Sequence, residues 1–126
     1  MSEELVRRVF DAFNAHDPDA WAELMVPGGT FTSAFWGIDG RSYTGRDGLA
    51  EYFQEMGEQW ASYSMEIIRV ETSGDTVVAV CRLHAVEPDT NVAVAPEQAL
   101  VFELDGDRAR SVVTVANVDE ALEMLS

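Results

Sequence analysis

The hairpin that decides the fold reads Val101-Phe102-Glu103-Leu104-Asp105-Gly106-Asp107. Its first half is rich in strand-forming residues, and Asp-Gly is a strong signal for a tight turn between antiparallel strands. A similar signal, Ser73-Gly74-Asp75, lies upstream. The two turns, with a looser link between them, divide the second half of the chain into predicted strands near 63–72, 76–87, 97–104 and 109–117. We therefore expect an antiparallel meander.

The first half of the chain has helical periodicity. Residues 2–15 carry apolar side chains at helical spacing, and Asp17-Pro18 can begin a second helix that Pro27-Gly28-Gly29 should end. A short strand is predicted at 30–36, and a final short helix at 119–125. The third helix has one wide apolar face, formed by Leu49, Tyr52, Phe53, Met56 and Trp60. Helices segregated from antiparallel strands indicate an α+β fold, in a single domain over residues 1–126.

The composition restricts the partners and the compartment. The formal charge is −15, with eight arginines and no lysine. Such a surface repels phosphate, so we expect neither nucleic acid nor an anionic membrane as a partner. Cys81 is the only cysteine and lies in an apolar run, where a buried structural thiol is expected. A lone cysteine, with no signal peptide or spanning segment recognised, favours a cytoplasmic protein.

The order of these elements and several short motifs resemble the nuclear transport factor 2-like superfamily, in its SnoaL-like branch. The motifs are Phe13-Asn14-Ala15-His16-Asp17-Pro18-Asp19-Ala20-Trp21, Tyr43-Thr44-Gly45-Arg46-Asp47-Gly48-Leu49, the hairpin at 101–107, and Asp119-Glu120-Ala121-Leu122-Glu123. The resemblance covers nearly the whole chain. It implies a cone-shaped, strongly bent antiparallel sheet wrapped around three N-terminal helices, with a pocket at the open end. It also implies a homodimer formed through the convex face of the sheet.

The catalytic residues of known relatives are mostly missing. Compared with the ketosteroid isomerases of this fold, Val9 stands in place of the oxyanion-hole tyrosine, Ser33 near the carboxylate base, and Gln98 in place of a protonated aspartate. The SnoaL polyketide cyclases use an acidic base on the last strand, where this chain has Val112-Val113-Thr114. These departures disfavour both mechanisms. Gln98 can still donate a hydrogen bond to a carbonyl oxygen.

Strand alternation supplies the candidate catalytic residues. Residues 78, 80, 82 and 84 share one face of a strand, and the resemblance places that face inside the cone, with Gln98 on the next strand. His84 is then the candidate acid or base, because imidazole titrates near neutral pH. Arg82 and Gln98 would polarise a substrate oxygen. The alternative is that Arg82 and His84 form a structural network at the mouth of the pocket.

The expected pocket walls are apolar with few polar groups, as at most small-molecule sites. The predicted ligand-binding residues are Trp21, Phe31, Ser33, Phe35, Tyr52, Phe53, Met56, Trp60, Met65 and Leu100. Aromatic residues at helical spacing are also typical of a core, and in a cone the two interpretations overlap. The two histidines, His16 and His84, have no metal-ligand spacing, so we expect neither a metal nor another cofactor.

Three functions fit this sequence. The first is a cofactor-free acid–base enzyme that cyclises, isomerises or hydrates a hydrophobic, oxygenated metabolite. The second is a non-catalytic domain that binds such a molecule in the same pocket, which the missing carboxylates favour. The third is a protein-interaction module of the same fold, which an exposed apolar patch would support.

Overall fold

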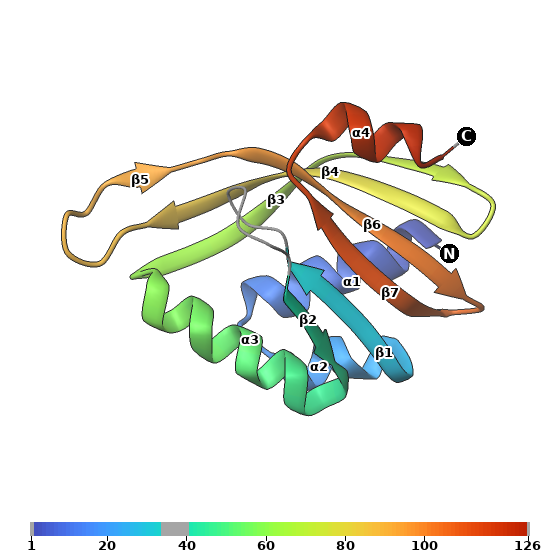
Figure 1. Cartoon of the computed structure of the whole chain (residues 1–126), viewed down its shortest axis with the longest axis horizontal. Coiled ribbons are helices and arrows are strands. Elements are labelled where there is room, and N and C mark those ends of the chain that lie inside the picture. Colours follow the sequence, from blue (N-terminus) through green and yellow to red (C-terminus); the bar gives the residue numbers. More distant parts are fainter. Residues whose placement is uncertain (1, 34–40, 126) are drawn as a thin grey trace.

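The computed structural model describes residues 2–33 and 41–125 and shows a curved sheet with helices on both faces (Figure 1). The helices are α1 (Ser2–Asn14), α2 (Pro18–Glu23), α3 (Gly45–Gln59) and α4 (Val118–Glu123). The strands are β1 (Met25–Ser33), β2 (Arg41–Thr44), β3 (Ser62–Ser73), β4 (Thr76–Val86), β5 (Ala93–Val94), β6 (Glu97–Asp105) and β7 (Arg108–Val115). The expected α+β class is confirmed.

The seven strands form one sheet in the order β2-β1-β7-β6-β4-β3, and β5 pairs with β4 beside this path. Strands β3, β4, β6 and β7 are joined antiparallel, as the two hairpin turns predicted. Strand β1 lies parallel to β7 and antiparallel to β2. The sheet is therefore mixed at one edge, where the sequence predicted antiparallel strands throughout.

The start of β1 differs from the prediction. The expected helix stop at Pro27-Gly28-Gly29 lies inside the strand, and α2 already ends at Glu23. Met25 pairs with Ala109 of β7, and pairing resumes only at Thr30. The residues between them leave the ladder as a bulge, with Gly28 at a left-handed φ of 77°. Pro27, Gly28 and Gly29, which the sequence predicted to end a helix, therefore interrupt a strand instead.

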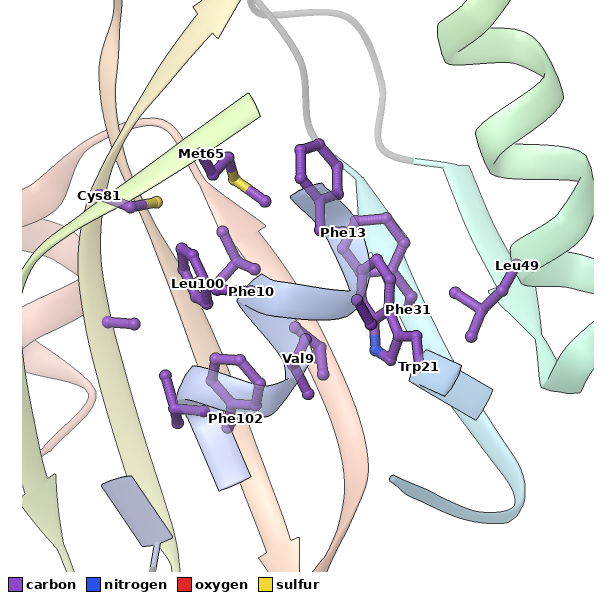
Figure 2. Close-up of a cluster of buried hydrophobic side chains, with 14 of the residues drawn as sticks. Val9, Phe10, Phe13, Trp21, Phe31, Leu49, Met65, Cys81, Leu100 and Phe102 are labelled. Atoms are coloured by element: carbon purple, nitrogen blue, oxygen red, sulfur yellow. The ribbon is translucent and has the colours of Figure 1, made fainter. Parts of the chain in front are cut away.

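The helical faces pack against one side of the sheet as their spacing predicted. Leu5, Val6, Val9, Phe10 and Phe13 of α1 are all buried, as are Leu49, Tyr52, Phe53 and Met56 of α3. Figure 2 shows Val9 and Phe10 of α1 on the side of Leu100 and Phe102 of β6, and Phe13 on the side of Trp21 and Phe31. Beside α3, the hydroxyl group of Tyr43 donates a hydrogen bond to Glu55 at 2.9 Å, which fastens β2 to that helix.

The first half of strand β4 is buried on both faces, and the face of β4 that lies inside is the opposite of the predicted one. The odd-numbered residues from Val77 to Ala85 face α1–α3 and join the larger core. Val78 and Val80 face the opposite way and form a second core with Ala121 of α4. Because α4 covers the outer face, the run from Val77 to Cys81 is apolar without alternation, and only the following Arg82 and His84 mark the even-numbered side as the polar face.

We predict that Ala121→Asp detaches α4. The Ala121 side chain is fully buried against the outer face of the sheet, so a carboxylate there would be desolvated without a partner. The free energy of unfolding should fall by about 2–3 kcal/mol, measured by urea denaturation. Met124→Asp places the same charge on a half-exposed side chain of the same segment and should cost less than about 1 kcal/mol. Equal losses in both variants would contradict the packing described for α4.

Candidate functional site

Arg82 and His84 lie on the outer face of the sheet, so the orientation predicted for them is wrong. The His84 side chain is about half exposed, and its Nε2 lies 3.1 Å from Oε1 of Glu66. Arg82 donates hydrogen bonds to the backbone oxygen of Ala95 at 2.9 Å and to Glu97 at 3.3 Å. The acid–base role predicted for His84 assumed an inward imidazole, and that premise fails.

Gln98 does face the interior, as predicted. It is 7% exposed and lies directly opposite Cys81 in the β4–β6 ladder. Its amide nitrogen donates to Sδ of Met65 at 3.7 Å, and the amide also hydrogen-bonds the Cys81 thiol. Figure 2 shows the sulfur atoms of Met65 and Cys81 at this end of the core. Within residues 2–33 and 41–125, these two sulfurs are the only hydrogen-bond partners of the amide group.

Thr114 is a second polar residue on the same inner face. It is 5% exposed, lies opposite Leu100 in the β6–β7 ladder, and shares its face with the core residue Val112. Gln98 precedes Leu100 by two residues, so Gln98 and Thr114 are diagonal neighbours across the two strands. The Thr114 hydroxyl group forms no hydrogen bond within the described part of the chain. Thr114 is not among the site residues predicted from the sequence.

The aromatic side chains of the interior form one connected cluster. Phe31 contacts the rings of Tyr52 and Trp21 at centroid distances of 4.7 and 4.9 Å. Tyr52 shares a side-chain hydrogen bond with Ser33 at the end of β1. Four members of the predicted ligand-binding set, Trp21, Phe31, Ser33 and Tyr52, therefore lie together. Ser33 and Tyr52 contribute the two hydroxyl groups among them.

The predicted site residues of this interior differ slightly in how completely they are buried. Trp21, Phe31 and Leu100 are at most 2% exposed and belong to the sealed part of the core. Six other predicted site residues keep between 5% and 8% of their surface exposed: Tyr52, Phe53, Met56, Trp60, Met65 and Gln98. They come from α3, its C-terminal end, β3 and β6. Phe35, the remaining predicted residue, lies outside the described residues.

The buried groups of this interior are neutral at physiological pH. Burial raises the pKa of the Cys81 thiol to about 12, with the Gln98 hydrogen bond opposing the shift. Burial also raises the pKa of Tyr52 above its ordinary value. Gln98 and Thr114 are the only buried side chains of polar or charged type in the described ranges. The arrangement can donate hydrogen bonds to a ligand oxygen, but it contains no buried carboxylate, imidazole or guanidinium group among these residues.

Comparison with known proteins places this fold in a family. A family model for the SnoaL-like domain matches residues 6–112. The chain belongs to the SnoaL-like family. No functionally curated protein gives a significant sequence match. Within the described ranges, no helix of this SnoaL-like chain is long and apolar enough to cross a membrane, and no cluster of histidine, cysteine or acidic side chains could hold a metal ion.

Several solved structures share the fold of this SnoaL-like chain. A hypothetical protein from Catenulispora acidiphila with a ketosteroid isomerase-like fold, in complex with trimethylamine, has a TM-score of 0.80 and 17% identity, over 97% of this chain and 92% of that one. TerC co-crystallised with polyporic acid has a TM-score of 0.79 and 13% identity, over 97% and 95%. A protein from Jannaschia sp. CCS1 assigned as a SnoaL-like polyketide cyclase has a TM-score of 0.75 and 19% identity, over 98% and 90%.

We predict that Cys81 contributes to a loss of stability in alkali. Its pKa is raised from 9.0 to about 12, so the stabilisation it gives to the fold is complete below pH 9 and is lost as the pH rises from 9 toward 12. The urea midpoint should therefore fall between pH 8 and pH 10. In Cys81→Ala the fall over this range should be shallower, because the raised tyrosine pKa values act at higher pH. Identical profiles would contradict the assignment.

Proposed function

We propose that this protein binds a neutral, hydrophobic, oxygenated small molecule in the interior of the sheet, beside Gln98 and Thr114. The observation that carries the proposal is the weak hydrogen bonding of a buried amide. A primary amide can form several hydrogen bonds, and burying it without good partners costs roughly 1–3 kcal/mol. Sulfur is a weak acceptor, so Met65 and Cys81 offset only part of this cost. A carbonyl or hydroxyl oxygen of a ligand would supply the missing partner.

The surroundings of Gln98 support an apolar ligand body. Met65 contacts the amide directly, and it belongs to the same buried core as Trp60 and the aromatic face of α3. Few convergent polar groups in an apolar setting are typical of small-molecule sites. Of the three functions predicted from the sequence, the non-catalytic ligand-binding domain is therefore better supported than the acid–base enzyme. The described interior offers no ionisable base that titrates near neutral pH. A carbonyl polarised by Gln98 would still be activated toward a reaction.

The third function, a protein-interaction module, has less support. The large apolar side chains that are exposed in the described ranges are Ile68, Val92 and Met124, and they come from β3, the β4–β5 link and the end of α4. These three side chains come from different segments of the chain, and none of them belongs to either hydrophobic core cluster. The homodimer expected from the resemblance remains a prediction. Its apolar contact surface would have to include α4, which covers Val78 and Val80.

We predict that Gln98→Leu separates binding from stability. The substitution keeps the approximate size of the side chain but removes the amide, so the fold should be equally stable or gain up to about 1 kcal/mol in urea denaturation. Binding of 1-tetralone, followed by tryptophan fluorescence, should weaken about 3- to 10-fold, the value of one neutral hydrogen bond. Binding of tetralin, which lacks the carbonyl oxygen, should not change.

Thr114→Val is the parallel test on β7, because valine keeps the shape of threonine and lacks the hydroxyl group. It should weaken tetralone binding by a similar or smaller factor. Gln54→Leu is the matched control, since Gln54 is an exposed glutamine on α3. The proposal would be wrong if the wild-type protein bound neither compound, or if Gln98→Leu lowered the affinity for both compounds equally.

A further inference from the structure

A groove of about 690 Å³ lies on the side of the molecule away from Gln98, where α2 ends and β1 and α3 begin. These three segments meet at the lower part of Figure 1. The floor of the groove is apolar and consists of Leu24, Met25, Phe31 and Leu49. Its volume falls within the range of about 300–1,000 Å³ that is usual for small-molecule sites. Among the described residues of the predicted ligand-binding set, only Phe31 lines this groove.

The bulge in β1 keeps the groove open. Strand β1 leaves the β7 ladder after Met25 and rejoins it at Thr30, so the intervening residues stand away from the sheet as one wall. Gly28 and Gly29 have no side chain to fill the space. A Cβ atom on Gly29 would lie 3.0 Å from both Cε of Met25 and the backbone oxygen of Val26, so a side chain there would be crowded, and Gly28 has a left-handed φ of 77° that favours glycine.

The groove lining is net positive, whereas the chain as a whole is strongly negative. Two of the eight arginines, Arg46 and Arg108, line it, and Glu23 is the single acidic lining residue in the described ranges. The lining therefore has a formal charge of +1 in a chain of −15. Nε of Arg46 lies 3.4 Å from Asp19, but both side chains are more than half exposed, so this pair is weak. Arg108 forms no side-chain ion pair or hydrogen bond within the described residues.

We propose that this groove is a second binding site, specific for a small organic anion with an apolar body. The apolar body would lie on Leu24, Met25 and Leu49, while a carboxylate, sulfonate or phosphate group would contact Arg46 and Arg108. Guanidinium groups bind such oxyanions through directional, charge-assisted hydrogen bonds. The strongly negative surface elsewhere repels anions, so the two arginines select this location. The proposal does not depend on the interior site.

The test uses 1-anilinonaphthalene-8-sulfonate, which combines an aromatic body with one anionic group. Titration of the full chain, followed by probe fluorescence, should show that Arg46→Gln/Arg108→Gln lowers the affinity at least 5-fold. N-phenyl-1-naphthylamine has nearly the same body without the sulfonate, and its affinity should be unchanged by the double substitution. Arg110→Gln is the control, because Arg110 is an exposed arginine on the same strand that does not line the groove.

Two further variants make the test decisive. Glu23→Gln removes the acidic lining charge found in the described ranges and should tighten binding of the sulfonate probe about 2- to 5-fold, a gain that damage to the fold would not produce. Gln98→Leu should leave the affinity for this probe unchanged, which separates the groove from the interior. The proposal is overturned if the double variant binds the sulfonate as the wild type does, if it loses the neutral probe equally, or if Glu23→Gln weakens binding.

Discussion

The arrangement of this protein depends on β4 being covered on both faces. The odd-numbered side chains from Val77 to Ala85 pack against α1–α3, while Val78 and Val80 pack under α4. A strand buried on both sides cannot slip by one residue without moving every side chain to the other core, so its register is fixed by two packing surfaces. That register places Cys81 opposite Gln98 and thereby sets the polar end of the interior.

The same constraint separates the charged and neutral groups of the sheet. Beyond the area covered by α4, the outer face carries Arg82 and His84, which pair with Glu97 and Glu66 in contact with water. Exposed pairs of this kind contribute little to stability, typically about 0–1 kcal/mol. The inner face carries Gln98 and Thr114, which are neutral and buried. Charge is thus excluded from the interior by the packing of β4, and any chemistry there must rely on hydrogen bonds.

The sequence predicted correctly those parts of the fold whose local pattern is typical of a single kind of structure. Helices α1 and α3 followed from apolar spacing, the hairpins from Ser73-Gly74-Asp75 and Asp105-Gly106-Asp107, and the inward side of Gln98 from the resemblance. The orientation of Arg82 and His84 failed because it was taken from the resemblance. The alternation of Arg82 and His84 with the apolar Cys81, Leu83 and Ala85 marks the even-numbered side as the polar face, although Val77–Cys81 alone is apolar at every position. The inward orientation of Thr114 and the pairing of Cys81 with Gln98 depend on the register between strands. No local sequence pattern in this chain predicts that register. The helix end predicted at Pro27-Gly28-Gly29 was wrong because Pro-Gly-Gly can interrupt a strand as readily as it ends a helix.

The two proposed sites would sort ligands by charge. Moving an ionised group into the interior would require several kcal/mol of desolvation, and one amide and one hydroxyl group return only about 1 kcal/mol each. A neutral carbonyl compound avoids that cost, so the interior should prefer it to its acid or phosphate derivatives. At the groove the balance is reversed, because Arg46 and Arg108 remain solvated and can bind an anion without burying it. If both proposals hold, a molecule with an oxygenated, uncharged ring system would bind beside Gln98, whereas the same ring system bearing a carboxylate would bind at the start of β1.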